Sequence, residues 1–134
     1  MRLYLVRHAE AAPGSPDELR PLTEAGRRAA RELGNRLAGE GLVDAVVTSP
    51  LLRARETAAA IARVAGAGGQ PAVDEGLAPG ATPESVLAAV LGRGERVVVV
   101  AHQPDCTRIA AAFTGEELPF PPGGMIAIEI AVTR

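Results

Sequence analysis

The run of residues 96–102, RVVVVAH, constrains the fold of this chain more than any other segment. Its four consecutive valines are β-branched, and no polar residue interrupts them. Such a run is typical of a strand covered on both faces, as in a parallel sheet that lies between two layers of helices. The sequence therefore predicts a buried sheet, and the remaining segments have to supply the helices that cover it.

The segments around this run alternate between strand and helix patterns. Strands are predicted at 2–6, 44–49, near 72–74 and at 125–132, and helices over 23–39, 50–65, 83–91 and 104–113. Thr23 is suited to cap the first helix, whose predicted buried stripe is Leu22, Gly26, Ala29, Ala30, Leu33 and Leu37. This order predicts an α/β fold, a three-layer sandwich whose central sheet is mostly parallel and has helices on both faces. No repeat or long linker divides the chain, so we expect one domain over residues 1–134.

Composition narrows the functional classes. The net charge is −2 and the basic residues do not cluster, which argues against a nucleic-acid or anionic-membrane surface. All 14 basic residues are arginine, so a lysine Schiff base and a P-loop lysine are excluded. The single cysteine, Cys106, forms no internal disulfide. Arg7 and His8 interrupt the first apolar run and no segment is long enough to span a bilayer, so we expect a soluble, cytoplasmic protein.

Polar side chains follow three of the predicted strands. The first strand leads to Arg7 and His8, the second to Ser49 with Arg53 one helical turn later, and the valine run to His102. Ligands of parallel α/β sheets bind beyond the carboxyl ends of the strands. Because the chain has only two histidines and both follow buried strands, we expect these side chains to form one site.

Two imidazoles and two guanidiniums with few carboxylates beside them predict a positive pocket for an anion with several oxygens. Arginine donates hydrogen bonds in a planar fork that matches phosphate. A neutral imidazole in such a pocket could attack phosphorus and form a phosphohistidine that water then cleaves. The arginines and the second imidazole would hold the equatorial oxygens as charge develops on them.

A zinc site is the first rival interpretation. His8, His102, Glu10 and Asp105 are conceivable ligands, but the chain has neither an HxH nor an HExxH pair, and adjacent arginines would repel a cation. We therefore expect no metal and no other cofactor.

Nucleophilic cysteine or serine chemistry is the second rival. A cysteine phosphatase needs an arginine six residues after the thiol, and this position is Ala112. A serine hydrolase of the G-x-S-x-G type needs a glycine-flanked elbow, which neither Ser49 nor Ser85 has. Both patterns leave histidine as the best nucleophile.

Four segments resemble the histidine phosphatase superfamily, which includes the phosphoglycerate mutases, and more closely its short SixA-type phosphohistidine phosphatase branch. LVRHAEA is similar to the opening strand with the RHG motif, and RPLTEAGRRAA to the start of the first helix. VVTSPLLRARETA is similar to the S-P-x-x-R-x-x-x-T segment, and VVVVAHQPD to the late strand with the second histidine. The segments occur in the family's order over almost the whole chain. The resemblance implies a phosphoglycerate mutase-like fold and a metal-independent phosphatase.

The resemblance also implies roles for individual residues. His8 would be the nucleophile, and the phosphate ligands would be Arg7, Arg53 and His102. The family's acidic proton donor would correspond to Glu75, with Glu10 as a second candidate because it lies two residues past the nucleophile. The branch tolerates Ala9 in place of the family's usual glycine.

The substrate follows less directly from the sequence. Arg20, in the predicted loop 12–21, is expected to contact it. The segment around Glu75 lacks the long insertion with which larger members cover their sites, so we expect an open cleft that accepts phosphohistidine on a protein partner. The alternatives are a small phosphate ester as the substrate, or a non-catalytic phosphate-binding module. Retention of His8 argues against the non-catalytic module, since a binder would need only the cations.

Overall fold

The computed structural model describes residues 1–66 and 69–131, and builds them around one five-stranded sheet. The strand order is β3-β2-β4-β1-β5, with neighbouring pairs parallel except for β5, which runs antiparallel to β1 at the edge. The strands are β1 (Arg2–Arg7), β2 (Ala45–Thr48), β3 (Ala72–Val73), β4 (Arg96–Ala101) and β5 (Met125–Glu129). The valine run is thus a central strand, as predicted.

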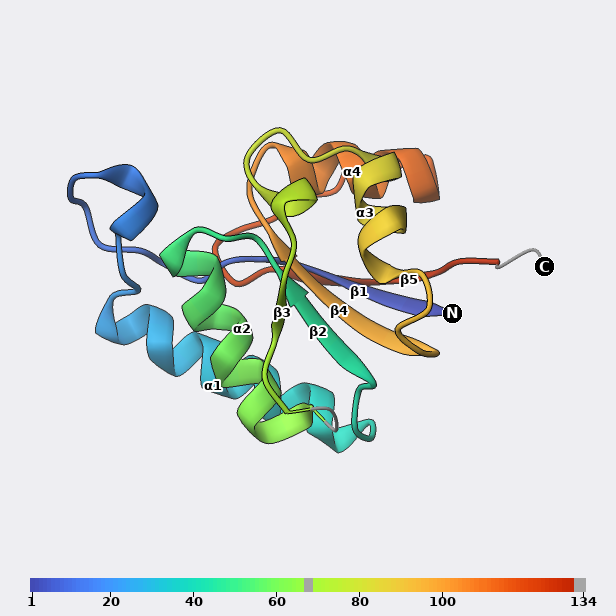
Figure 1. The fold of residues 1–134 in the computed structure, drawn as a ribbon, viewed down its shortest axis with the longest axis horizontal. Coiled ribbons are helices and arrows are strands. Elements are labelled where there is room, and N and C mark those ends of the chain that lie inside the picture. Colours follow the sequence, from blue (N-terminus) through green and yellow to red (C-terminus); the bar gives the residue numbers. More distant parts are fainter. Residues whose placement is uncertain (67–68, 132–134) are drawn as a thin grey trace.

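Helices cover both faces of the sheet (Figure 1). One face carries α1 (Glu24–Gly39) and α2 (Leu52–Ala65), and the other carries α3 (Pro83–Val90) and α4 (Asp105–Thr114). Two 3-10 turns, η1 (Asp17–Leu19) and η2 (Glu75–Leu77), lie in the connections. The predicted three-layer α/β fold is confirmed. No helix within the described ranges is long and apolar enough to cross a membrane.

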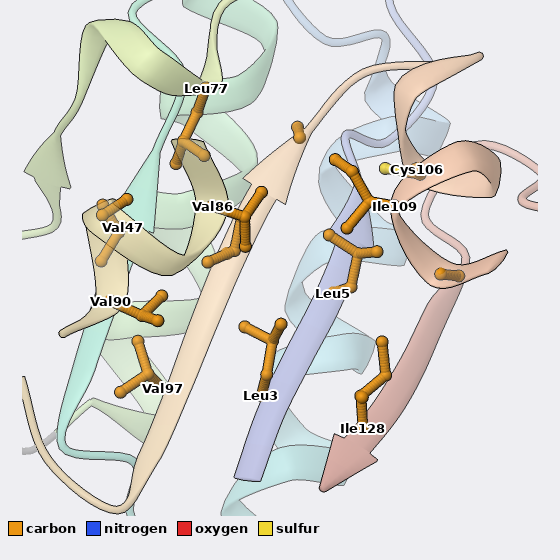
Figure 2. Close-up of a cluster of buried hydrophobic side chains, with 14 of the residues drawn as sticks. Leu3, Leu5, Val47, Leu77, Val86, Val90, Val97, Cys106, Ile109 and Ile128 are labelled. Carbon is orange, nitrogen blue, oxygen red and sulfur yellow. The ribbon is translucent and has the colours of Figure 1, made fainter. Parts of the chain in front are cut away.

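The core is divided by the alternation of side chains along the strands. Leu3 and Leu5 of β1 point to the α3 and α4 face, where they join Val86 and Ile109 (Figure 2). The intervening Tyr4 points to the α1 and α2 face. Full burial of one such aliphatic side chain contributes about 1.5–3 kcal/mol, so the two clusters fix the sheet between its helices.

Helix α1 begins where the sequence predicts. The Thr23 hydroxyl accepts a hydrogen bond from the Gly26 amide at 2.9 Å. The predicted buried stripe is wrong at Ala29, which is exposed, because the helix is rotated toward Gly34. A β-carbon at Gly34 would lie 3.2 Å from the Ala60 carbonyl oxygen, so the missing side chain lets α1 approach the backbone of α2.

Other boundaries shift by a few residues. Pro50 precedes α2 instead of forming its first turn, since α2 begins at Leu52. Strand β5 ends at Glu129, and the last residue of the predicted strand 125–132 lies outside the described residues, as do 67–68 of the predicted turn 66–71. The loop 12–21 contains η1, which the sequence pattern did not indicate.

Candidate active site

The carboxyl ends of β1, β4 and β2 meet at one edge of the sheet. The parallel register aligns Val6 and Thr48 with Val100 of the strand between them. His8 and His102 are each two residues beyond this level, so they stand opposite one another across adjacent strands, with ring centroids 5.2 Å apart. That separation is close to the spacing of neighbouring strands, about 4.8 Å. The structure therefore brings together the two histidines that the sequence placed at strand ends.

The His8 ring has one nitrogen engaged and one available. Its Nδ1 lies 2.8 Å from the carbonyl oxygen of Ala9. A carbonyl only accepts, so a neutral His8 carries its hydrogen on Nδ1 and keeps a lone pair on Nε2. Burial lowers the pKa of His8, and the charges of Arg53 and Arg7 lower it further. The ring is therefore neutral at pH 7, which a nitrogen nucleophile requires.

His102 is buried against the end of β2. Its Nε2 lies 2.7 Å from the Ser49 Oγ, and its buried Nδ1 has no hydrogen-bond partner within the described residues. Burial lowers the pKa of His102 to about 4, and the nearby His8 and Arg53 lower it further because they disfavour a second positive charge. Burial thus keeps both imidazoles neutral, so the positive charge of the predicted pocket comes from its arginines.

Arg7 is held by a segment distant in sequence. Its Nη1 donates to the Phe120 carbonyl at 2.9 Å, and the Gly123 amide donates back to the Arg7 carbonyl at 3.1 Å. Its Nε is buried and has no partner in the part of the chain described. The guanidinium thus keeps a buried N–H that no residue of the described part accepts. Nothing in the local sequence 119–124 indicates this support.

Arg53 occupies the first turn of α2 and is 8% exposed. Its Nη1 donates to the Asp17 carbonyl oxygen at 2.9 Å, and its Nη2 to the Asp17 carboxylate at 3.2 Å. Asp17 therefore holds the loop that carries η1 against Arg53. The sequence did not predict this role for Asp17.

Arg20 binds the same carboxylate. Its Nη1 donates to Asp17 at 3.0 Å, and its Nε donates to the Ala12 carbonyl at 2.8 Å. Hydrogen bonds from Arg20 and Arg53 lower the pKa of Asp17. The Asp17 carboxylate thus joins Arg20 to Arg53, so Arg20 lies near another of the predicted residues.

Thr57 links the backbone of Ala9, next to His8, to the first turn of α2. Its buried Oγ1 accepts from the Ala9 amide at 3.0 Å and donates to the Arg53 carbonyl at 2.8 Å. The backbone of Ala9 is therefore held at its amide by Thr57 and at its carbonyl by the His8 ring. The threonine of the S-P-x-x-R-x-x-x-T segment has a positioning contact here.

The two acid candidates are exposed and differ in surroundings. Glu75 lies in η2 beyond the carboxyl end of β3, and has no side-chain hydrogen bond or ion pair with the residues that the structure describes. The Glu10 carboxylate accepts from the Thr23 hydroxyl at 2.7 Å and so supports the start of α1. Neither carboxylate is hydrogen bonded to His8 or His102 within the described ranges.

The rival chemistries find little support. The Asp105 carboxylate accepts from the Gly80 amide at 2.8 Å, so it is engaged away from the histidines, and no group of three His, Cys, Asp or Glu residues with metal-binding geometry occurs in the described part. Burial raises the pKa of the Cys106 thiol to about 12, which makes it a poor nucleophile.

Comparison with known proteins bears on this site. The sequence profile of the histidine phosphatase superfamily (branch 1) matches residues 3–78, more than half of the chain. An uncharacterised protein of Picosynechococcus sp. is 37% identical over 147 residues, which cover 100% of this chain and 88% of that protein.

Solved structures agree with this match. The protein histidine phosphatase SixA complexed with tungstate has a TM-score of 0.87 and 26% identity, over 97% of this chain and 88% of that chain. A phosphoserine phosphatase of Entamoeba histolytica shares the fold with a TM-score of 0.70 and 17% identity, over 94% and 89% of the two chains.

Proposed function

Because this chain belongs to the histidine phosphatase superfamily and is a phosphatase, we propose that it dephosphorylates phosphohistidine on proteins through a phosphohistidine on its own His8. In the first step the His8 Nε2 lone pair forms a bond to phosphorus while the P–N bond to the substrate imidazole breaks. The leaving imidazole takes up one proton from solvent, and the water that attacks in the second step returns one proton to solvent. Water then attacks phosphorus, the bond to Nε2 breaks, and inorganic phosphate leaves. The superfamily and the SixA neighbour support chemistry that needs no metal ion.

The observation that carries the proposal is a pair of unsatisfied nitrogens around a neutral nucleophile. The Arg7 Nε and the His102 Nδ1 are buried and have no hydrogen-bond partner in the described part of the chain. Buried donors in proteins are almost always paired, and leaving one unpaired costs about 1–3 kcal/mol. Oxygens of a phosphoryl group bound beside His8 would supply the missing acceptors. The tungstate in the SixA neighbour is an oxyanion of similar shape, which supports this use of the pocket.

The short stretches between the site residues support a phosphorylated protein as the substrate, because they leave few residues to cover the site. Only 21 residues separate Arg53 from Glu75, and 26 separate Glu75 from His102. The described residues of these stretches include α2, β3, α3 and β4, which pack in the sandwich. A small substrate usually gains specificity by enclosure, whereas a phosphorylated side chain on a protein surface can enter an open cleft.

The loop that carries η1 supports a protein partner more directly. It projects past the carboxyl edge of the sheet (Figure 1), and residues 13–19 are exposed. Leu19 in this loop is 58% exposed, two residues from Asp17, which binds Arg53. A large apolar side chain beside the site gives a docking protein a contact that a free phosphate ester would not reach.

Trapping the intermediate tests the mechanism. Wild-type protein quenched during turnover should carry phosphate that is labile in acid and stable in base, whereas the folded His8→Ala variant should carry none and should not turn over. Near-wild-type activity in His8→Ala would refute the mechanism.

A matched pair of leucine variants tests the substrate class. Leu19→Ser should lower kcat/KM for a phosphohistidine protein and leave it unchanged for a small phosphate ester. Leu91→Ser is the control, since Leu91 is 60% exposed after the end of α3 and leads to the amino end of β4, opposite the strand ends that carry the site. If an ester matches the phosphohistidine protein in wild type, the substrate claim fails while the mechanism stands.

A further inference from the structure

Ser49 stands between the end of β2 and the start of α2 and is fully buried. Its Oγ accepts a hydrogen bond from the Leu51 amide at 3.2 Å and lies 2.7 Å from the His102 Nε2. The serine is thus the one hydrogen-bond partner of the His102 ring among the described residues.

The hydrogen of this hydroxyl decides which ring nitrogen of His102 is protonated. A hydroxyl has one hydrogen to donate, and the Leu51 amide already uses the Ser49 oxygen as an acceptor. The acceptor that remains within reach is the His102 Nε2. A neutral imidazole has one bare nitrogen and one N–H, so if Nε2 accepts, Nδ1 carries the hydrogen. The reverse assignment would leave the buried hydroxyl hydrogen without an acceptor.

We propose that Ser49 fixes His102 as the Nδ1–H tautomer, and that this N–H donates to an oxygen of the phosphoryl group bound beside His8. This inference rests on the proposed function for the place of the phosphoryl group. Ser49 is a positioning residue that acts through His102. His102 then serves as a neutral donor, in agreement with its lowered pKa.

The two histidines have different roles because one ring is paired with a hydrogen-bond acceptor and the other with a donor. The Ala9 carbonyl accepts from the Nδ1–H of His8 and leaves its Nε2 bare for attack on phosphorus. The Ser49 hydroxyl donates to Nε2 of His102 and leaves its Nδ1–H free to bind oxygen. Both rings are thus the same tautomer, and the partner determines which nitrogen faces the ligand.

Imidazole ¹⁵N NMR of the untagged protein at pH 7.5 tests the tautomer without any assay of activity. The chain has two histidines, and the His8→Asn spectrum assigns them. Both should be Nδ1-protonated in wild type, and inorganic phosphate should shift the His102 Nδ1–H. In Ser49→Ala, His102 should lose its preference for Nδ1–H, while His8 should keep it as the internal control.

Kinetics test the consequence. Ser49→Ala should lower kcat by roughly tenfold or more with KM changed little, since a misoriented donor weakens transition-state stabilisation. Thr48→Val is the matched control, because the Thr48 hydroxyl is also buried at the end of β2 but donates to the Ser49 carbonyl at 3.0 Å and not to the ring. It should keep the wild-type spectrum and kcat.

Three results would overturn the inference: Nε2–H on His102 in wild type, an unchanged tautomer in Ser49→Ala, or an unchanged kcat in that variant. If wild type showed the expected spectrum and phosphate shift but hydrolysed no phosphorylated substrate, the proposed function would fail and the assignment of Ser49 would stand.

Discussion

Burial of the His102 ring should make the folded protein lose stability as the pH falls from 6.5 toward 4. The unfolded chain takes up a proton on this imidazole near its ordinary pKa of 6.5, whereas the folded protein does so only near a pKa of about 4. Between these values the unfolded state binds more protons than the folded state, so acid favours unfolding. Above pH 6.5 the ring is neutral in both states and its contribution to stability is fully retained.

The size of the effect follows from the shift. Each pKa unit corresponds to about 1.4 kcal/mol, so a pKa lowered from 6.5 to about 4 removes about 3 kcal/mol of unfolding free energy once the pH is below both values. At pH 5 the same relation gives about 2 kcal/mol. That loss is a substantial part of the 5–15 kcal/mol typical of a folded domain.

The measurement compares wild type with His102→Gln, which keeps an amide within reach of Ser49 but cannot titrate. Urea unfolding is followed by circular dichroism at pH 7.5 and pH 5.0, since the chain has no tryptophan. The loss of unfolding free energy between the two pH values is taken for each protein separately. Carboxylates that titrate in both proteins contribute equally to the two losses and cancel in the comparison. Wild type should lose about 2 kcal/mol more than the variant between the two pH values. Equal losses would refute the argument from burial.

Four further outcomes follow from the site. Activity should survive a chelator and fall with vanadate, which copies five-coordinate phosphorus; loss in chelator that zinc or manganese restores would contradict this. Arg53→Ala should lower kcat by about 100-fold or more, and lysine should not rescue it because it lacks the planar fork. Asp17→Asn should let inorganic phosphate inhibit a few-fold more strongly, since the carboxylate occupies the N–H groups of Arg53 and Arg20. Glu75→Gln, or Glu10→Gln if that carboxylate is the donor, should slow an alkyl phosphate ester more than phosphohistidine, because the imidazole leaving group needs less help from an acid; equal slowing of both substrates would exclude the acid role.

The fold could be predicted because its main signals are local. Residues Val97–Val100 are fully buried, as an unbroken β-branched run indicates, and the Thr23 cap marks the start of α1 within one residue. The burial of Ala29 was predicted wrongly because helical periodicity gives the spacing of a stripe but not its rotation. That rotation depends on the contact of Gly34 with α2, which no local pattern contains.

Arg7, His8 and His102 lie at strand ends, which is why the sequence could indicate them. Their partners could not be found in the same way, because the contacts join residues far apart in the chain. The Phe120 carbonyl lies 113 residues from Arg7, and Ser49 lies 53 residues from His102. The sequence also could not indicate which ring nitrogen of each histidine carries the hydrogen, because this depends on the partners that the folded protein supplies.

The positive charge of this site comes from arginine and not from histidine. Burial keeps both imidazoles neutral, and the positive charges that act on His8 are those of Arg53, Arg7 and Arg20. In the proposed mechanism a protonated His8 would have no lone pair for phosphorus, so the burial that removes its charge would also allow it to react. Arginine is suited to supply the charge instead, since it stays protonated when buried. Charge for binding and a lone pair for attack are therefore assigned to different residue types, and burial at the strand ends maintains the separation.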